Sequence, residues 1–437
     1  MTSVNRTLAL TGESKKLTIS MWVKRSKISA EQWVVTSHYN GTYFGDIRFQ
    51  SDDTLRFTDY RNSYVMNLIT NAKFRDPNGF YHILCSFDST VGSPQAKIYV
   101  NGQLQTLSTN TNYSQNAATS WTTDYTLHIG NDGSGTEYKG LISDFYFIQG
   151  YEYAPTVFAE EDATTGEWKP KTNASVNYST TGTNSCHLKF ENAANPDLDS
   201  GDNNLSFSTS GNLISVKDNP SNVFATWNPL NNYFAASTFS QGNNTIATNA
   251  GNYTWNTSTL GFQTGKWYWE NKIVSTSTTD MFGITGRVNS NDVHNELGEF
   301  ADTYGFNAES GNMHNNNTNT AYASAFQTNG NIVQIAVDMT NLKIHLGVNG
   351  VWQNSSNPSN NTGGFTIGAI STTTDGFYFP AIGDWSSNAG TFSTNFGNGY
   401  QGTTAVSSAG ANASGIGIFE YDVPTGFTAL STKGLNL

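Results

Sequence analysis

Apolar and polar residues alternate along most of the chain with the period of two that is typical of a β-strand. Residues 17–24 predict a half-buried strand, with apolar side chains at Leu17, Ile19, Met21 and Val23. Similar segments follow up to residue 152, namely WVVTSHY, DIRFQ, TLRFTDY, YHILCSF, AKIYV, YTLHIG and LISDFYFI. Clusters of Asn, Gly, Asp and Ser separate them, and this spacing predicts a β-sandwich or barrel.

Residues 223–437 show the same pattern of strands and turns. The strand at 265–275 is followed by MFGITG, TYGFNA, IVQIAVDM, KIHLGVNG, YFPAIG and STNFGN. In both halves a strand ending in Val is followed by Asn-Gly, at Asn101-Gly102 and at Asn349-Gly350. This dipeptide favours a tight hairpin with positive φ at both residues. No apolar stripe has helical spacing, so we expect almost no helix.

Residues 153–222 differ from both flanking regions. They contain one clear predicted strand at 187–192 and weaker ones at LSFS and LISV. We interpret this stretch as a structured connector that adds edge strands to the first domain. The sequence therefore predicts an all-β protein with antiparallel β-sandwich domains at 1–152 and 223–437, joined by the connector.

Composition narrows the class of protein. Charged residues are only 13% of the chain, against about 25% in an average protein, and 52 residues are asparagine. The formal net charge is −12, so an acidic surface disfavours nucleic acid as a partner. Aromatic residues make up 13% of the chain, which excludes a disordered polar chain because these side chains need burial or a ligand.

Features that indicate cellular location are few. The start of the chain lacks the charged and apolar regions of a signal peptide, and no apolar stretch reaches the length of a membrane span. We therefore expect synthesis in a cytosol and no membrane insertion. The two cysteines, Cys85 and Cys186, lie in alternating apolar segments and are interpreted as buried small side chains, not as a disulfide.

The chain offers little for catalysis. A retaining glycosidase needs two carboxylates about 5 Å apart, yet no E-x-D-x-E pattern occurs, and the densest acidic cluster, at 160–162, falls in the connector. The histidines show neither ligand spacing nor a partner serine motif. Loops at 131–134 and 197–202 could supply oxygen ligands to calcium, but Asp and Asn also make turns. We predict no catalytic residues, no metal and no cofactor.

Aromatic residues near predicted loops carry the best indication of binding. Sugar rings stack their C–H faces on Trp or Tyr, while Asn and Asp bind the hydroxyl groups. The predicted ligand-binding residues are Tyr39, Tyr43, Tyr60, Tyr64 and Trp121 in the first domain, and Trp352 and Trp385 in the second, where His314 is a further candidate. The alternative for each residue is that it covers the end of a sandwich core.

Family resemblances refine the fold prediction. The segments LTISMWVKRS, YHILCSFDST, AKIYVNGQL, HIGND and GLISDFYFIQGYEY resemble the laminin-G-like branch of concanavalin-A-type lectins. This resemblance implies a jelly roll of two curved sheets. The second half resembles a SPRY domain through GKWYWENKI, FGITG, YGFNAESG, the run from Asp338 to Gly350, and FYFPAIG followed by NFGN.

The order of the modules carries a third resemblance. A lectin-like domain, a W-K-P-K connector, the phrase FATWNPL, a SPRY-like domain and a terminal PTGFTALST resemble virion proteins of marine bacteriophages. That resemblance implies a fibre or other appendage on the virion surface. We therefore expect a non-catalytic protein that binds host-surface glycan or protein during adsorption. Its expected partners are other virion proteins, in a homo-oligomer or symmetric assembly.

Two other functions remain open on the sequence. The chain could be a structural protein that decorates a capsid or tail without binding a receptor. A glycan-degrading enzyme is a weaker alternative, because candidate acids are lacking. No coiled-coil heptads precede the first strand, so attachment is expected through a domain surface or the C-terminal segment.

Overall fold

The computed structural model describes residues 2–9, 15–117, 119–121, 123–178, 184–232, 235–249, 252–288, 295–386 and 388–437. Two compact units divide the chain. Unit 1 is Met1–Ser215 with Asn219–Ser221, and unit 2 is Val216–Asp218 with Asn222–Leu437. Most of the stretch interpreted as a connector thus lies in unit 1. All named strands pair antiparallel except one short parallel pair in unit 2, so the predicted all-β, antiparallel fold class is confirmed.

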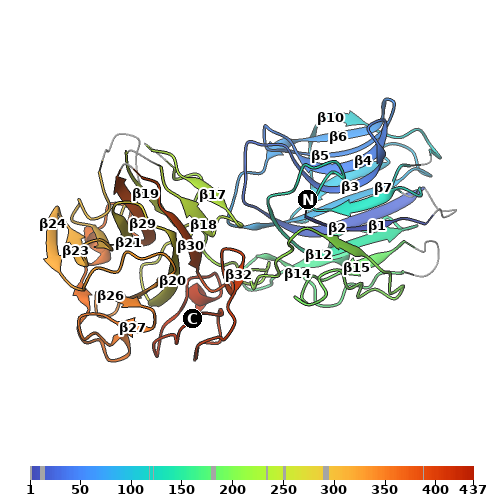
Figure 1. The fold of residues 1–437 in the computed structure, drawn as a ribbon. Helices are drawn as coiled ribbons and strands as arrows, with labels where there is room; N and C mark the ends of the chain where they lie inside the picture. Colours follow the sequence, from blue (N-terminus) through green and yellow to red (C-terminus); the bar gives the residue numbers. More distant parts are fainter. Residues whose placement is uncertain are drawn as a thin grey trace. The chain divides into compact units, whose positions relative to one another are not determined.

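Unit 1 is a sandwich of two sheets (Figure 1). Sheet A contains, in spatial order, β10 (Leu107–Thr111), β6 (Tyr64–Lys73), β5 (Thr54–Arg61), β4 (Tyr43–Phe49), β3 (Gln32–Asn40), β11 (Thr126–Ile129), β1 (Ser3–Thr7) and β16 (Ser208–Ser210). Sheet B contains β15 (Cys186–Leu188), β12 (Gly140–Gln149), β2 (Lys16–Arg25), β7 (Phe80–Asp88), β8 (Ala96–Val100) and β9 (Gln103–Leu104). The core between them includes both cysteines, which are free thiols as predicted.

The first part of the stretch interpreted as a connector covers the face of sheet B that points away from sheet A. After β12 the chain forms the 3-10 turn η1 (Pro155–Val157) and the hairpin of β13 (Ala159–Glu161) and β14 (Trp168–Pro170). Phe158 is buried in a cluster with Leu84 and Tyr146 of sheet B. For this reason β2 is buried on both faces, and the prediction of a half-buried strand at 17–24 is wrong.

The strand predicted at 187–192 is shorter in the structure. Only Cys186–Leu188 pairs with β12, and Phe190 has a φ of 59°, which ends the extended backbone. The segment LISV is not a strand, while β16 begins beyond LSF and pairs with β1. Strand β15 therefore extends sheet B, and β16 extends sheet A.

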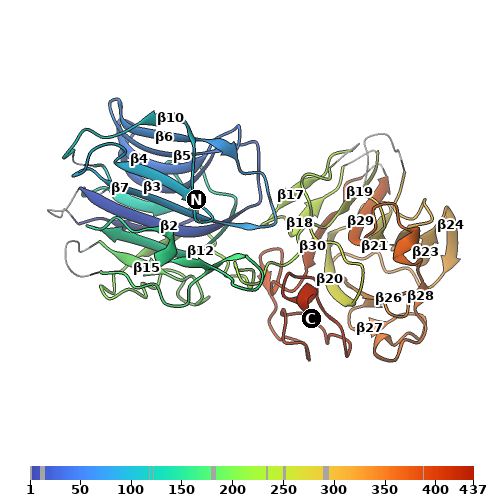
Figure 2. The ribbon, with the colours of Figure 1, turned by 180° about the vertical axis from the view of Figure 1, so that it is seen from behind.

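Unit 2 is also built from two large sheets (Figure 2). Sheet C contains β17 (Thr238–Ser240), β18 (Thr245–Ala247), β30 (Thr391–Asn395), β20 (Lys266–Ser275), β25 (Ile332–Asp338), β26 (Lys343–Val348) and β27 (Val351–Trp352), with β28 (Phe365–Thr366) beside β26 and β33 (Thr428–Ala429) beside β20. Sheet D contains β19 (Asn252–Thr257), β29 (Phe379–Ser386), β21 (Asp280–Thr285), β22 (Thr303–Asn307), β23 (Asn312–Asn315) and β24 (Thr318–Ala321).

The core of unit 2 follows the alternation in the sequence. Trp267, Trp269 and Ile273 of β20 are buried together with Phe282 of β21. The smaller elements are the hairpin of β31 (Tyr400–Gln401) and β32 (Thr404–Ala405) and the 3-10 turns η2 (Pro358–Asn360), η3 (Ile370–Thr372) and η4 (Gly434–Asn436).

Both Asn-Gly turns are confirmed. Asn101 and Gly102 have φ values of 48° and 77°, and Asn349 and Gly350 have 48° and 83°, as the tight hairpin requires. Across the described residues, the helices are four short 3-10 turns, in agreement with the expected lack of helix.

Among the described residues, no helix combines the length and the apolar character needed to cross a membrane.

Candidate functional site

Sheet A turns one set of side chains away from the core. In β4, Ile47 and Phe49 face the core, and Leu55 and Phe57 do so in β5. Because successive residues of a strand point to opposite faces, the residues between them lie on the other side of the sheet. We call this side the outer face of sheet A. It carries Phe44, Asp46 and Arg48 of β4 and Arg56, Thr58 and Tyr60 of β5.

Four aromatic rings touch in sequence on this face. The ring centroids of Trp33 and Phe44 are 6.1 Å apart, edge to face. Phe44 stacks on Tyr60 at 5.1 Å, and Tyr60 meets the edge of Tyr64 at 4.9 Å. These residues come from β3, β4, β5 and β6, which are neighbours in the sheet. We call them the aromatic band.

Two arginines flank the band. Arg48 and Arg56 lie directly opposite each other on β4 and β5. The guanidinium carbon of Arg48 lies 4.1 Å from the ring centroid of Trp33, and that of Arg56 lies 4.5 Å from Tyr64. Each contact has the geometry of a cation–π interaction. The band is therefore held at both ends by a charged side chain.

Asp46 lies between the arginine pair and the stacked rings. It is two residues from both Phe44 and Arg48 along β4 and faces Thr58 across to β5. Its side chain is fully buried, and neither carboxylate oxygen has a hydrogen-bond partner among the described residues. The nearest charge contact is Arg48 Nε, at 3.5 Å from Oδ1. Burial raises the pKa of Asp46 to about 6, although Arg48 and Arg56 act to lower it.

This face offers apolar ring faces beside polar groups. Such a mixture suits sugars, whose rings have one apolar face and hydroxyl groups at the edge. Tyr64 is the most accessible member of the band, with 45% of its surface exposed. An aromatic pair contributes about 0.5–1.5 kcal/mol beyond simple burial, so several such contacts are needed for measurable binding.

The structure divides the tyrosines named from the sequence. Tyr60 and Tyr64 belong to the aromatic band. Tyr39 is 65% exposed and stacks on Tyr125 at 5.2 Å, and this pair makes no ring contact with the band among the described residues. The hydroxyl of Tyr43 accepts a hydrogen bond from Asn62 Nδ2 at 2.7 Å.

The structure corrects the prediction that Trp121 binds a ligand. Its side chain is fully buried and packs at 5.6 Å from Phe57 in the core of unit 1. The indole Nε1 donates a hydrogen bond to the carbonyl oxygen of Thr58 at 3.2 Å. The ring therefore has no face available for a ligand.

The candidates in unit 2 do not form a comparable site. Trp352 is half-buried and packs against Tyr268 with ring centroids 6.4 Å apart. His314, expected in a loop, is buried in β23, which corrects its position. The backbone of Trp385 is part of β29, but its side chain lies outside what the structure describes.

Sequence reasoning missed Trp33, Phe44, Asp46, Arg48 and Arg56. Their strands were predicted, and alternation around Ile47 and Phe57 indicates which residues point outward. Their contacts depend on the register between strands, which the sequence does not contain. A bulge in β3 between Trp33 and Val35 also breaks the alternation.

One serine–histidine pair resembles a catalytic arrangement. Ser20 Oγ lies 2.8 Å from His82 Nε2, while Trp168 Nε1 lies 3.0 Å from His82 Nδ1. An indole N–H can only donate, so Nδ1 accepts and the proton of neutral His82 is on Nε2. Burial lowers the pKa of His82 to about 3. The ring therefore donates to Ser20 and cannot remove its proton.

In each of the two loops considered for calcium, one carboxylate accepts hydrogen bonds from backbone N–H groups. Asp132 Oδ1 accepts hydrogen bonds from the backbone N–H groups of Ser134, Gly135 and Thr136 at 2.7–2.9 Å. Burial would raise the pKa of Asp132, but these bonds outweigh it and lower the pKa to about 2. Asp199 likewise accepts from the backbone of His187, Gly201 and Leu205. These contacts support the turn interpretation.

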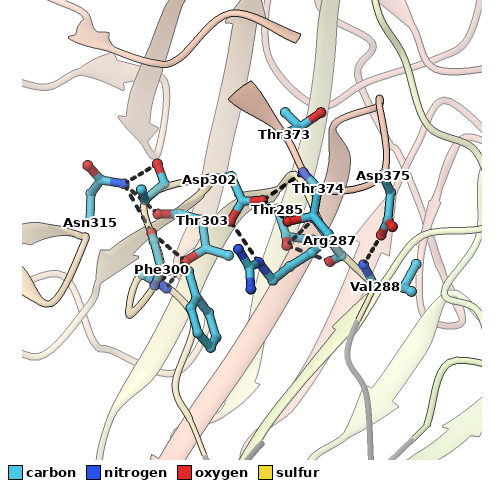
Figure 3. A network of polar contacts seen from close by, with 12 residues as sticks. Thr285, Arg287, Val288, Phe300, Asp302, Thr303, Asn315, Thr373, Thr374 and Asp375 are labelled. Atoms are coloured by element: carbon cyan, nitrogen blue, oxygen red, sulfur yellow. Dashed lines mark hydrogen bonds and ion pairs between the residues drawn. The ribbon is translucent and has the colours of Figure 1, made fainter. Parts of the chain in front are cut away.

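A polar network in unit 2 fixes three separate segments (Figure 3). Arg287 Nε lies 2.7 Å from Asp302 Oδ1, and its guanidinium carbon lies 4.0 Å from the centroid of Phe300. Asp302 Oδ2 also accepts from the N–H and hydroxyl groups of Thr374 at 2.9 and 2.8 Å. Burial alone would raise the pKa of Asp302. The hydrogen bonds from Arg287 and Thr374 outweigh burial and hold this pKa below its ordinary value. Both carboxylate oxygens of Asp302 are thus engaged within the fold.

The comparisons agree with the fold of unit 1. Residues 2–151 match the family described as the Concanavalin A-like lectin/glucanases superfamily. This confirms the lectin-like resemblance of the first part of the chain. No curated protein matches the sequence. The aromatic band lies within the matched residues.

Solved structures are similar to parts of the chain. The SPRY domain of human HERC1 is 17% identical with a TM-score of 0.30, covering 38% of this chain and 96% of that chain. A SAP-like pentraxin from Limulus polyphemus is 17% identical, TM-score 0.26, covering 34% and 69%. Domain 4 of the arabinanase AbnA from Geobacillus stearothermophilus is 15% identical, TM-score 0.27, covering 34% and 66%.

Proposed function

We propose that the chain is a non-catalytic binding protein whose unit 1 binds glycans on the outer face of sheet A. The observation that carries this proposal is the aromatic band from Trp33 to Tyr64, within the residues that match the lectin-like family. Its rings touch one another across four strands and so form a continuous surface. The stacked contacts in the sheet preorganise this surface, which reduces the entropy lost on binding.

The expected affinity of one site is low. Stacking contributes about 1 kcal/mol per ring beyond burial, and a few such contacts give millimolar binding. Repeated copies in an assembly raise the effective affinity through multivalency. A glycan receptor on a cell surface, which presents many identical units, is the type of ligand that such a protein would bind.

The place of action is a further part of this proposal and is based on the resemblance in module order. It supports a bacteriophage virion surface protein, in a fibre or other appendage, that binds host glycan during adsorption. In this proposal the SPRY-like unit 2 contacts other virion proteins, and the protein works as a homo-oligomer or in a symmetric assembly. A capsid- or tail-decorating protein without receptor binding is the second candidate, favoured by the many carboxylates and aromatic rings already engaged within the fold.

A glycan array probed with the full chain tests the proposal. We expect binding to a subset of glycans, lost when Trp33 and Tyr60 are both changed to alanine while the protein stays folded. Absence of binding on the array and on host cells, together with stable incorporation into particles, would favour the decorating role. Release of reducing sugars from host polysaccharide would instead indicate an enzyme.

A further inference from the structure

Asp46 has an environment unlike those of two other buried acids nearby, Asp53 just before β5 and Asp59 within it. Asp53 contacts Arg25 and Arg75 at 3.0 and 2.9 Å and accepts from the backbone N–H of Ser29. Asp59 accepts from the hydroxyl of Tyr113 and the backbone N–H of Ser120. In both cases the carboxylate holds segments of the chain together, which explains why it is buried.

Asp46 has no comparable structural role. Both of its oxygens are inaccessible and lack a hydrogen-bond partner among the described residues. Arg48 is at a long 3.5 Å and also contacts Glu31 Oε1 at 3.2 Å, while Arg56 Nε donates to Asn67 Oδ1 at 2.9 Å. A buried, unbonded carboxylate destabilises a fold. Its position at the centre of the proposed glycan site therefore needs another explanation.

We infer that Asp46 is a specificity-determining residue that accepts hydrogen bonds from the hydroxyl groups of a neutral sugar stacked on the aromatic band. This inference rests on the proposed function. Both oxygens of Asp46 are inaccessible in this structure, so binding requires the side chains that cover the carboxylate to move as the sugar enters. A sugar with two adjacent hydroxyl groups supplies the donors that both oxygens lack.

The charges on the outer face favour a neutral ligand over an acidic one. Two arginines, Arg48 and Arg56, face two acids, Asp46 and Glu31, so the group is balanced when all are ionised. An added carboxylate or sulfate would lie next to Asp46 and be repelled. A neutral hexose chain instead places ring faces on the aromatic rings and hydroxyl groups toward Asp46.

The substitution Asp46→Asn tests the inference because it keeps the shape and removes the charge. The full chain and the variant are titrated with maltotriose and cellotriose as neutral probes and trigalacturonic acid as the acidic probe, and their melting temperatures are measured. We expect wild-type binding to a neutral probe that exceeds binding to the acidic one. Asp46→Asn should weaken this binding roughly tenfold, the size of one charge-assisted hydrogen bond, without lowering the melting temperature.

Two control variants separate the possible roles. Asp124→Asn removes one negative charge at an exposed position and should change neither binding nor melting. Asp59→Ala removes the oxygen that accepts the bonds from Tyr113 and Ser120 and should lower the melting temperature. If Asp46→Asn melts earlier or does not fold, Asp46 is structural and the inference is wrong.

The remaining outcomes distinguish this inference from the proposed function. If Asp46→Asn binds the neutral probe as well as wild type while Tyr60→Ala does not, the aromatic site stands and the role of Asp46 is refuted. Preference for trigalacturonic acid would also overturn the neutral-ligand assignment. If no probe binds here and no glycan binds on the array, the proposed function fails and this inference fails with it.

Discussion

Gly45 leaves the space that the indole of Trp121 occupies. A β-carbon on Gly45 would lie 2.5 Å from Cε2 and 2.6 Å from Nε1 of Trp121, well inside van der Waals contact. Gly45 is part of β4, so the absence of a side chain serves close packing at this point. The pair explains why a tryptophan between polar residues is a core residue in unit 1.

Replacement of Trp121 by alanine should therefore act on stability. We expect Trp121→Ala to lower the free energy of unfolding by about 3–5 kcal/mol, the usual cost of removing a large buried aromatic side chain. Gly45→Ala should also destabilise unit 1, because the ring cannot move without disturbing Phe57. Denaturant unfolding measures both effects. If Trp121→Ala instead keeps its stability but loses glycan binding, Trp121 contacts the ligand and is not a core residue.

The difference between Trp121 and Tyr60 shows what sequence reasoning could reach. Alternation identified the strands and the residues that face each core, and Asn-Gly identified the turns at 101 and 349. Polar neighbours placed both Trp121 and Tyr60 near loops. Contacts of Trp121 with Gly45, Phe57 and the Thr58 carbonyl distinguish the two residues, and these contacts join residues that are distant in the sequence.

The sequence also could not predict which side chains lie next to one another on the outer face of sheet A. The stacking of Phe44 on Tyr60 depends on their exact pairing across β4 and β5. A shift of register by one residue would turn each strand's outward side chains toward the core. Hydrophobic pattern fixes which face is inside, but the identity of cross-strand neighbours follows from turns and bulges that form with the whole sheet.

The aromatic band gives a direct prediction for binding. Tyr64→Ala should weaken glycan binding about fivefold to tenfold, because one accessible stacking surface is lost. Its melting temperature should change little, since Tyr64 is partly exposed and loses only its contacts with Tyr60 and Arg56 at the surface. Tyr39→Ala is the matched control, because Tyr39 is exposed but stacks on Tyr125 outside the band. An equal loss of binding in both variants would contradict a site confined to the band.

Glu270 holds the C-terminal part of unit 2 to β20. Its two carboxylate oxygens accept hydrogen bonds from the backbone N–H groups of Glu420 and Tyr421, each at 2.9 Å. The hydroxyl of Tyr268 donates to the same carboxylate at 2.9 Å. Since Glu270 is fully buried, this single side chain fixes residues that the sequence places 150 positions away.

Glu270→Ala should destabilise unit 2 by about 2–4 kcal/mol, because it leaves two backbone donors without their charged acceptor. We also expect faster proteolysis of the chain near residue 420. Glu420→Ala is the control, because Glu420 takes part through its backbone and should keep the contact. Limited proteolysis with mass spectrometry compares the variants. Equal protection of both would show that this segment is held by other contacts.

Asp280 and Asp384 face each other on β21 and β29, and both are fully buried. Ser277 Oγ lies 2.6 Å from Asp280 Oδ1 and 2.9 Å from Asp384 Oδ1. A hydroxyl has one proton to donate, so two ionised carboxylates cannot both be bonded to it as acceptors. Thr248 donates to Asp384 at 2.8 Å. Burial raises the pKa of Asp280 and raises that of Asp384 to about 6.

The Asp280–Asp384 pair should therefore contribute more stability to unit 2 in mild acid than at neutral pH. A carboxyl group whose pKa is higher in the folded than in the unfolded state contributes stability that is full below its ordinary pKa of 3.8 and lost as the pH rises through about 6. Asp384→Asn should raise the free energy of unfolding at pH 7.5 by about 1–3 kcal/mol and reduce the pH dependence. Hydrogen exchange of β21 and β29 between pH 5 and 7.5, corrected for intrinsic rates, measures this in unit 2 alone.

Asp375→Asn is the control, because this exposed residue can still accept the bond from the Val288 N–H through its amide oxygen. Unchanged pH dependence in Asp384→Asn would show that the pair does not share a proton.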